Sequence, residues 1–164
     1  MQSYTVIPNE EAIDRMVRFM GMQFINFDGN IYSTLRSLSG NAYDGGLWEF
    51  REYPNGAVVM VFPSQEMVTC TCHGLMKDVE MTLEALSLVA NAFVLRGIQN
   101  AAVLHGDDAD AERLHDLYHG VRDAVSGRMD FIITDQGISE PTEEDLLKPR
   151  SPHPESQKFY DMLD

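Results

Sequence analysis

Two adjacent glycines, Gly45-Gly46, followed closely by the single tryptophan, Trp48, constrain the fold of this chain more than any other feature. Glycine adopts positive φ values that other residues avoid, so the pair predicts an abrupt turn at the start of a strand. The strand-like run continues through Phe50 and ends at Asn55-Gly56, a pair that strongly favours a tight hairpin turn. The segment therefore predicts one side of a β-hairpin in a fixed register.

Length and composition predict one domain with a packed core. The chain has 164 residues, of which 44% are hydrophobic, and this proportion excludes global disorder. No apolar run approaches the ~20 residues of a membrane span, and residues 1–8 lack the pattern of a signal peptide. A disulfide between Cys70 and Cys72 would strain so short a loop. We therefore expect a cytoplasmic protein with reduced thiols.

The charge balance is strongly acidic. A formal net charge of −14, from 26 acidic and 12 basic residues, repels nucleic acid and anionic membrane surfaces. It permits a fit to a basic partner, and solubility alone also explains it. A close mimic of duplex DNA needs about one charge per 1.7 Å of axis. Here the acids cluster at 107–112 and 140–145, which favours protein–protein contact over mimicry.

Hydrophobic periodicity predicts an α+β fold, in which a three-stranded antiparallel β-meander packs with about four helices. The predicted strands cover residues 47–53, 57–62 and 67–72. The predicted helices cover residues 9–20, 31–38, 77–96 and the stretch that follows the acids at 107–110. Glycines mark the expected helix ends, at Gly21, Gly97 and Gly127. Residues 22–27 are expected to be irregular, and 57–62 is expected to be the central strand.

Composition changes after about residue 135. Residues 1–135 are predicted to form the α+β domain, and residues 136–164 a Pro-rich, acidic C-terminal extension with one helical turn near 142–147. Four apolar residues at its end are expected to dock back onto the body: Phe159, Tyr160, Met162 and Leu163.

Two groups of residues have the chemistry of metal ligands. His115 and His119 share one helix face, and Asp116 beside them could polarise a metal-bound water. A third ligand could come from Asp123, Asp135 or His105. The alternative is a solvated flank of the helix.

Cys70, Cys72 and His73 form the second group, which lacks the usual spacing and a second ligand pair. Two thiols that face the core from one strand explain Cys70 and Cys72 equally well. No phosphate loop and no nucleophile elbow is present in the sequence.

The hairpin resembles the ArdB/KlcA-type antirestriction proteins. That family has a Tyr-x-Gly-Gly-x-Trp-x-Phe strand, an Asn-Gly turn and then an apolar strand. The matching residues here are Tyr43, Asp44, Gly45, Gly46, Trp48, Phe50, Asn55 and Gly56. Weaker matches lie at 80–85 and at Tyr118 with Arg122-Asp123. The likeness spans roughly residues 14–130.

The resemblance implies a small α+β domain carried on plasmids, phages or other mobile elements. It implies relief of host type I restriction of incoming DNA by a non-enzymatic binding mechanism, without a cofactor. The implied partner is a host restriction–modification complex or an associated protein, with no direct nucleic-acid or membrane binding. Two alternatives stay open. One is a metal-dependent hydrolase that uses His115 and His119, and the other is an accessory interaction protein with another host target.

The exposed face of the hairpin is a candidate contact surface. It would present Tyr43, Asp44, Glu49, Arg51 and Asn55. A structural role explains the motif as well, because glycines and Asn55 serve turns while aromatic residues fill the core.

Overall fold

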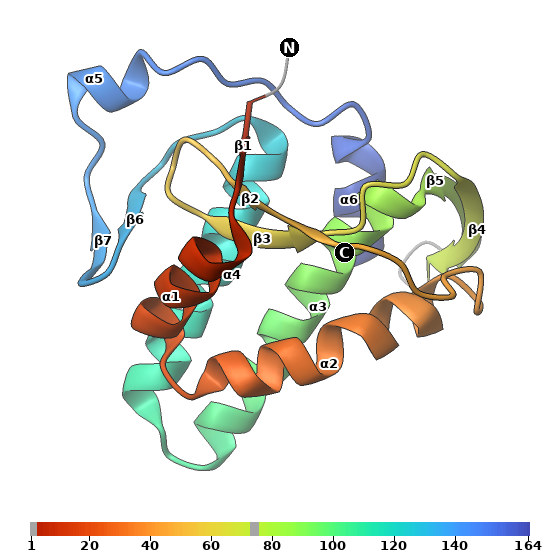
Figure 1. Ribbon diagram of the computed structural model, residues 1–164, viewed down its shortest axis with the longest axis horizontal. Helices are drawn as coiled ribbons and strands as arrows, with labels where there is room; N and C mark the ends of the chain where they lie inside the picture. Colours follow the sequence, from red (N-terminus) through yellow and green to blue (C-terminus); the bar gives the residue numbers. More distant parts are fainter. Residues whose placement is uncertain (1–2, 73–75) are drawn as a thin grey trace.

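Helices α3 and α4, joined by a short turn, form the centre of the fold (Figure 1). The structure is a computed structural model, which describes residues 3–72 and 76–164. The helices are α1 (Asn9–Met20), α2 (Gln23–Leu38), α3 (Leu83–Leu104), α4 (Asp108–Ser126), α5 (Glu143–Leu146) and α6 (Ser156–Leu163). The strands are β1 (Thr5–Ile7), β2 (Glu49–Glu52), β3 (Val58–Val61), β4 (Met67–Cys72), β5 (Lys77–Thr82), β6 (Ile132–Thr134) and β7 (Gly137–Ser139). The predicted α+β class is confirmed.

Helix α3 is apolar over much of its circumference and is buried on several sides. Thr82 caps its start, where the Thr82 hydroxyl accepts a hydrogen bond from the Ala85 N–H at 3.1 Å. By length and composition alone, α3 could cross a membrane. This corrects the expectation that no apolar segment approaches the length of a membrane span. Since 61% of its most apolar window is buried within the fold, α3 serves here as a core helix.

The predicted helix over 77–96 was wrong at both ends. Residues 77–82 form strand β5, and Gly97 lies inside α3 rather than at its end. In β5 the side chains of Val79 and Met81 point inward on alternate positions, the pattern of a strand.

The three-stranded sheet is antiparallel and has the order β1-β2-β3, so β2 is central and β3 is an edge strand. All four residues of β3 are nevertheless buried, because α3 covers its free edge. The Asn91 side chain donates to the Met60 carbonyl at 2.7 Å and accepts from the Met60 N–H at 3.2 Å. Ser87 Oγ accepts from the Phe62 N–H at 3.1 Å. Side chains of α3 thus form the hydrogen bonds with backbone groups at the β3 edge that a fourth strand would otherwise form.

The sequence predicted that residues 67–72 complete a three-stranded meander. In the structure, strand β4 instead pairs with β5 in a separate two-stranded sheet. The predicted face pattern is confirmed, since the side chains of β4 are alternately exposed and buried. Val68, Cys70 and Cys72 point into the core, while Thr69 and Thr71 face outward.

The expected helix ends at Gly21 and Gly127 are confirmed, with φ values of 59° and 74°. Residues 22–27 are not irregular, however, because α2 begins at Gln23 directly after the Gly21 turn. Pro8 rather than Asn9 occupies the N-cap of α1.

The C-terminal residues return to the core. The chain passes through α5, whose capping box between Thr142 and Asp145 confirms the predicted helical turn. It then runs across the top of Figure 1 to α6. Phe159 and Met162 are buried there, as expected for docking. The predicted division at residue 135 falls in the turn of the β6–β7 hairpin, where Thr134 pairs with Gly137.

Candidate functional site

The Gly-Gly-Trp motif builds an aromatic cluster. Trp48 Nε1 donates a hydrogen bond to the Tyr43 hydroxyl at 2.9 Å, and the Tyr43 ring meets Phe62 edge-on with centroids 5.0 Å apart. Gly46 has a φ of +142°, and a Cβ on it would lie 2.5 Å from Phe62 Cε1. Only glycine therefore lets the backbone approach the ring this closely.

The Asn-Gly turn docks the hairpin onto the second half of the chain. Asn55 Nδ2 donates to the Gly120 carbonyl of α4 at 2.8 Å, and Asn55 Oδ1 accepts from the Ala57 N–H at 3.0 Å. The Asn55 carbonyl accepts from the Ile133 N–H at 2.8 Å. A Cβ on Gly56 would lie 2.4 Å from the Ile133 carbonyl oxygen. Both turn residues are therefore fixed by long-range contacts.

These positions correct the predicted contact surface. Tyr43, Arg51 and Asn55 are buried, with exposed fractions of 4%, 2% and 2%, so they cannot meet a partner in the folded state. Asp44 stays exposed, and Leu47 is 90% exposed. The accessible part of the motif is thus the glycine loop at 44–47.

The Arg51 side chain is the centre of a buried polar cluster that sequence reasoning missed. Arg51 Nη2 lies 2.6 Å from Glu49 Oε1 and 3.2 Å from Glu84 Oε2. Its guanidinium carbon lies 4.0 Å from the centre of the Tyr4 ring. Burial raises the pKa of Tyr53 nearby to about 12. Alternation along β2 placed Arg51 on the outer face, but Tyr4 covers that face.

The cluster extends to the C-terminal segment through His153. The Glu155 N–H donates to His153 Nδ1 at 3.0 Å, so Nδ1 is an acceptor. The proton of the neutral ring is therefore on Nε2, which donates to Glu84 Oε1 at 2.8 Å. The hydrogen bond from His153, followed by that from Arg51, lowers the pKa of Glu84 to about 2. Glu155 in turn accepts from the Thr82 N–H at 2.9 Å.

This polar cluster joins strand β2, the start of α3 and the C-terminal segment. General acid–base chemistry needs groups whose pKa values lie near neutral pH. Here Glu84, with a pKa of about 2, stays ionised, and Tyr53, with a pKa of about 12, stays protonated. A cavity of about 210 Å³ lies beside the cluster, lined by Ser3, Tyr4, Tyr53, Glu84, Ser151, Pro152, His153 and Pro154.

The structure does bring His115 and His119 together, with ring centroids 4.4 Å apart. The three suggested third ligands do not join them. Asp123 is buried, His105 Nδ1 lies 2.7 Å from the Ala101 carbonyl, and Asp135 lies 3.6 Å from Arg18. Within residues 3–72 and 76–164, no three His, Cys, Asp or Glu side chains gather as a metal site.

Cys70 and Cys72 are free thiols buried in the core. The Cys72 thiol donates to the Asp161 carbonyl of α6 at 2.9 Å, and Cys70 Sγ lies 3.4 Å from the Val79 carbonyl oxygen. Burial raises the pKa of Cys70, which is the opposite of what a nucleophilic cysteine needs. The third member of the predicted group, His73, lies outside the described residues.

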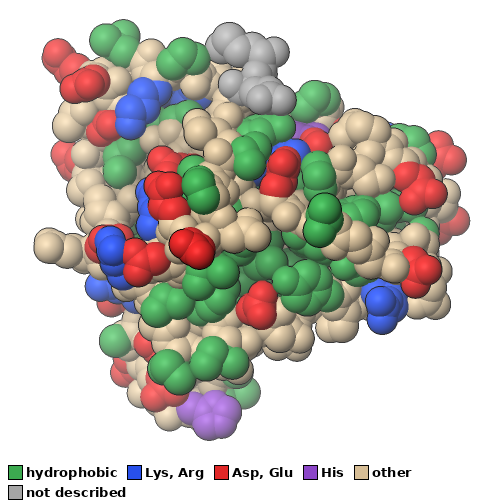
Figure 2. Space-filling model, in the orientation of Figure 1, with side chains coloured by type: hydrophobic (Ala, Val, Ile, Leu, Met, Phe, Trp, Pro, Cys, Tyr) green, Lys and Arg blue, Asp and Glu red, His purple; other side chains and the backbone are tan. Residues whose placement is uncertain are grey.

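An open groove between α2 and α3 is a further concave feature that could meet a partner. It has a volume of about 570 Å³ and is lined by Gln23, Asn26, Asn30, Thr34, Phe93, Val94, Gly97, Ile98, Ala101, Ala102, His105 and Asp107. In the view that carries α2 in front, hydrophobic side chains gather over the middle of the face, and acidic side chains lie mostly around them (Figure 2).

These features define a small α+β domain in which the Gly-Gly-Trp and Asn-Gly elements of the hairpin motif are fixed by packing against the rest of the fold. The same fold occurs in a solved structure of the KlcA and ArdB proteins, which are described as having a novel fold and antirestriction activity against type I DNA restriction systems in vivo but not in vitro. The two structures superpose with a TM-score of 0.68, at 21% sequence identity, over 99% of this chain and 96% of the other.

The chain therefore has the KlcA/ArdB fold, as its hairpin motif predicted. The match reaches beyond residues 14–130 and takes in the C-terminal extension. No protein-family model matches the sequence, and no curated protein matches it.

Proposed function

We propose that this chain is an antirestriction protein of a mobile element, which relieves type I restriction of incoming DNA in the host cytoplasm by binding rather than by catalysis. The observation that carries the proposal is the fold, shared over 99% of the chain with proteins that have antirestriction activity against type I systems in vivo. The hairpin motif at residues 43–56, which resembles that of the ArdB/KlcA-type proteins in sequence, also supports it.

The side chains support a binding mechanism. In the buried polar cluster, Glu84 stays ionised and Tyr53 stays protonated near neutral pH, and the burial of Cys70 makes its thiol a weak nucleophile. Neither group provides the reactive side chain that a hydrolase needs.

The partner we propose is a protein, either the restriction–modification complex or a factor associated with it. Acidic side chains do not form a continuous row on the face seen in Figure 2, and on its left side Lys and Arg lie among them. A DNA mimic needs a regular array of carboxylates. The neighbouring KlcA and ArdB proteins act in vivo but not in vitro, which favours a mechanism that needs a further cellular factor.

The exposed glycine loop at 44–47 is the part of the motif that we propose for the contact. Leu47 is 90% exposed in a loop whose position the buried aromatic cluster fixes. A rigid, exposed apolar side chain is a typical anchor at a protein interface.

Phage plating tests both proposals. Unmodified phage should plate with higher efficiency on a type I restricting host that expresses the protein, and with unchanged efficiency on a host without the system. Leu47→Asp should lose the effect, whereas Leu147→Asp is a matched control, because Leu147 is 83% exposed on a different segment. Relief that survives Leu47→Asp would refute the contact alone, while no relief by the wild-type chain would refute the function.

A further inference from the structure

One face of the α3–α4 pair gathers positive charge in a chain that is otherwise strongly acidic. The guanidinium carbon of Arg96, on α3, lies 4.3 Å from the centre of the Tyr118 ring, and that of Arg122, on α4, lies 5.7 Å from the same ring. Arg122 also lies 5.1 Å from the centre of the Tyr160 ring of α6. Three helices therefore hold two guanidinium groups around one buried tyrosine.

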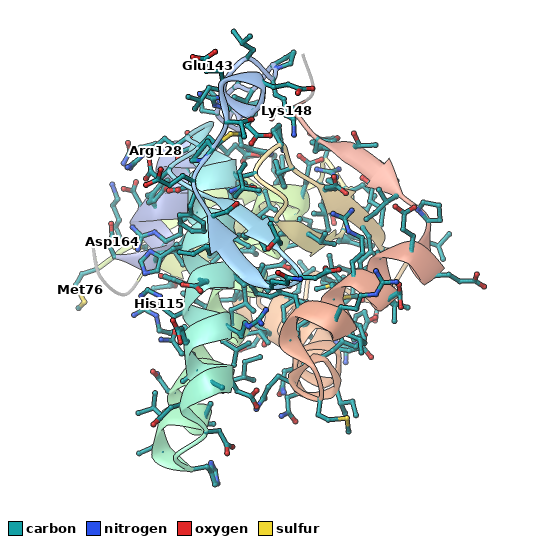
Figure 3. All side chains as sticks on the ribbon, turned by 90° about the vertical axis from the view of Figure 1, so that its left-hand side faces the viewer. Met76, His115, Arg128, Glu143, Lys148 and Asp164 are labelled. Carbon is teal, nitrogen blue, oxygen red and sulfur yellow. The ribbon has the colours of Figure 1, made fainter. Side chains whose placement is uncertain are left out.

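Two histidines lie beside these arginines on α4. His119 packs edge-on against Tyr118, with centroids 5.3 Å apart, and His115 lies one turn earlier. Burial, and then the positive charges of His115, Arg122 and Arg96, lowers the pKa of His119. His119 is thus within electrostatic reach of both arginines. His115 lies on the side of α4 that faces away from α1 and α2 (Figure 3). We call Arg96, His115, His119 and Arg122 the basic patch.

Some arginines of the chain pair with a carboxylate, whereas the two of the basic patch, like Arg36, Arg113 and Arg150, have no such pair among the described residues. Arg15, Arg18 and Arg128 each pair with a carboxylate. Neither Arg96 nor Arg122 has one within 4.0 Å in the part of the chain that the structure describes.

An acidic side chain also lies beside the basic patch. Asp116 lies 3.5 Å from His115 and partly offsets its positive charge. Composition does not force such a cluster, because acids outnumber basic residues by 26 to 12. Like charges this close repel each other, and a bound anion would remove that repulsion.

We propose that the basic patch binds an oxyanion, a phosphate or a carboxylate group, between Arg96, Arg122 and His119. A planar guanidinium donates paired hydrogen bonds that fit either group. The Arg122 side chain is already positioned, since its Nη1 lies 3.5 Å from the Tyr118 hydroxyl and its guanidinium carbon lies 5.1 Å from the centre of the Tyr160 ring. Less side-chain freedom is then lost on binding.

The site recognises the anionic group alone and not a nucleobase. Tyr118, the ring beneath the arginines, is only 3% exposed, so no base can stack on its face. The site is therefore suited to one oxyanion rather than to a nucleic-acid strand. This inference does not depend on the proposed antirestriction function.

Histidine NMR of the full-length chain tests the proposal. We expect sodium phosphate, added at constant pH and ionic strength, to shift the His115 and His119 ring signals saturably and to raise the pKa of His119. His105, at the far end of α3, is the internal control and should not respond. Sodium acetate is the second arm. A response to phosphate alone identifies a phosphate site, and an equal response to acetate identifies a carboxylate site.

Substitutions separate a site from general ionic effects. Arg96→Gln should weaken anion binding roughly tenfold, because a lost charge-assisted hydrogen bond changes affinity by about that factor. The fold should be unaffected, since Arg96 is exposed. Arg128→Gln, at an exposed arginine paired with Asp130, is the matched control and should bind like wild type. Equal shifts at His105, full binding by Arg96→Gln, or no saturable response to either anion would overturn the proposal.

Discussion

Replacing Asn55 by alanine should destabilise the protein strongly without touching its surface. The Asn55 side chain is 2% exposed and joins the hairpin turn to α4 through hydrogen bonds with Gly120 and Ala57. Alanine removes both bonds and leaves the Gly120 carbonyl and the Ala57 N–H without these partners.

The expected loss follows from those groups. Each intramolecular hydrogen bond contributes about 1 kcal/mol net, and a buried polar group left without a partner costs about 1–3 kcal/mol. Since both bonds are lost together and relaxation recovers part of the cost, we expect the free energy of unfolding to fall by about 2–4 kcal/mol. For a chain of this size that corresponds to a decrease in Tm of roughly 5–15 °C.

Urea unfolding measures this change directly. Trp48 is the single tryptophan and lies in the same hairpin, so its fluorescence reports the transition, and circular dichroism checks that helix is lost at the same urea concentration. Asn30→Ala is the matched control, because Asn30 makes an exposed hydrogen bond to the Asn26 carbonyl within one helix and should change stability by less than about 0.5 kcal/mol. An Asn55→Ala midpoint equal to that of wild type would refute the structural role assigned to the motif.

Three further outcomes follow from the buried groups. Gly46→Ala should lower the free energy of unfolding, measured in urea, by about 1–3 kcal/mol, because its φ is +142° and the added Cβ would lie 2.5 Å from Phe62; an unchanged urea midpoint would contradict this packing. The pKa of Glu84 is lowered from 4.5 to about 2 in the folded state, so its stabilisation is present above pH 4.5 and is lost as the pH falls towards 2. The stability gap between wild type and Glu84→Gln, at most about 3 kcal/mol, should therefore shrink over that range, and a gap independent of pH would count against the His153 contact. Finally, Cys70 should react with a thiol reagent only on unfolding, since it is buried and its pKa is raised; rapid labelling of the native protein would show otherwise.

The sequence predicted those parts of the fold that depend on local conformation. Helix ends at Gly21 and Gly127 were found because positive φ favours glycine, and both residues have it. The inward face of β4 was found because alternation along a strand is local. The capped turn at α5 followed from its acidic first turn and Thr142.

The errors arose where distant segments decide the structure. The stretch 77–82 was assigned to a helix because its apolar residues merge with those of α3, and only its pairing with β4 shows that it is a strand. β3 was placed in the centre of the sheet because it is wholly apolar, yet Asn91 and Ser87 of α3 cover its edge instead of another strand. No local pattern indicates that cover.

The buried polar cluster around Arg51 also depends on distant segments, and the sequence did not predict it. Arg51 was expected on an exposed face, because β2 alternates and Arg is usually exposed. Its burial depends on Tyr4, which precedes it by 47 positions in the numbering, and on Glu84, which lies 33 positions after it. The link from Glu84 to His153 spans 69 positions. The motif was recognised from its spacing alone, but its role as a folding element became evident only from the partners of Gly46 and Asn55.

The efficiency of plating of unmodified phage on a type I restricting host tests the central claim most directly. Expression of the wild-type chain should raise plating on that host towards the level of a host without the restriction system, and should leave plating on the second host unchanged. The same restricted plating with and without the protein, while the protein is present and folded in the cells, would contradict the assignment of antirestriction function to this chain.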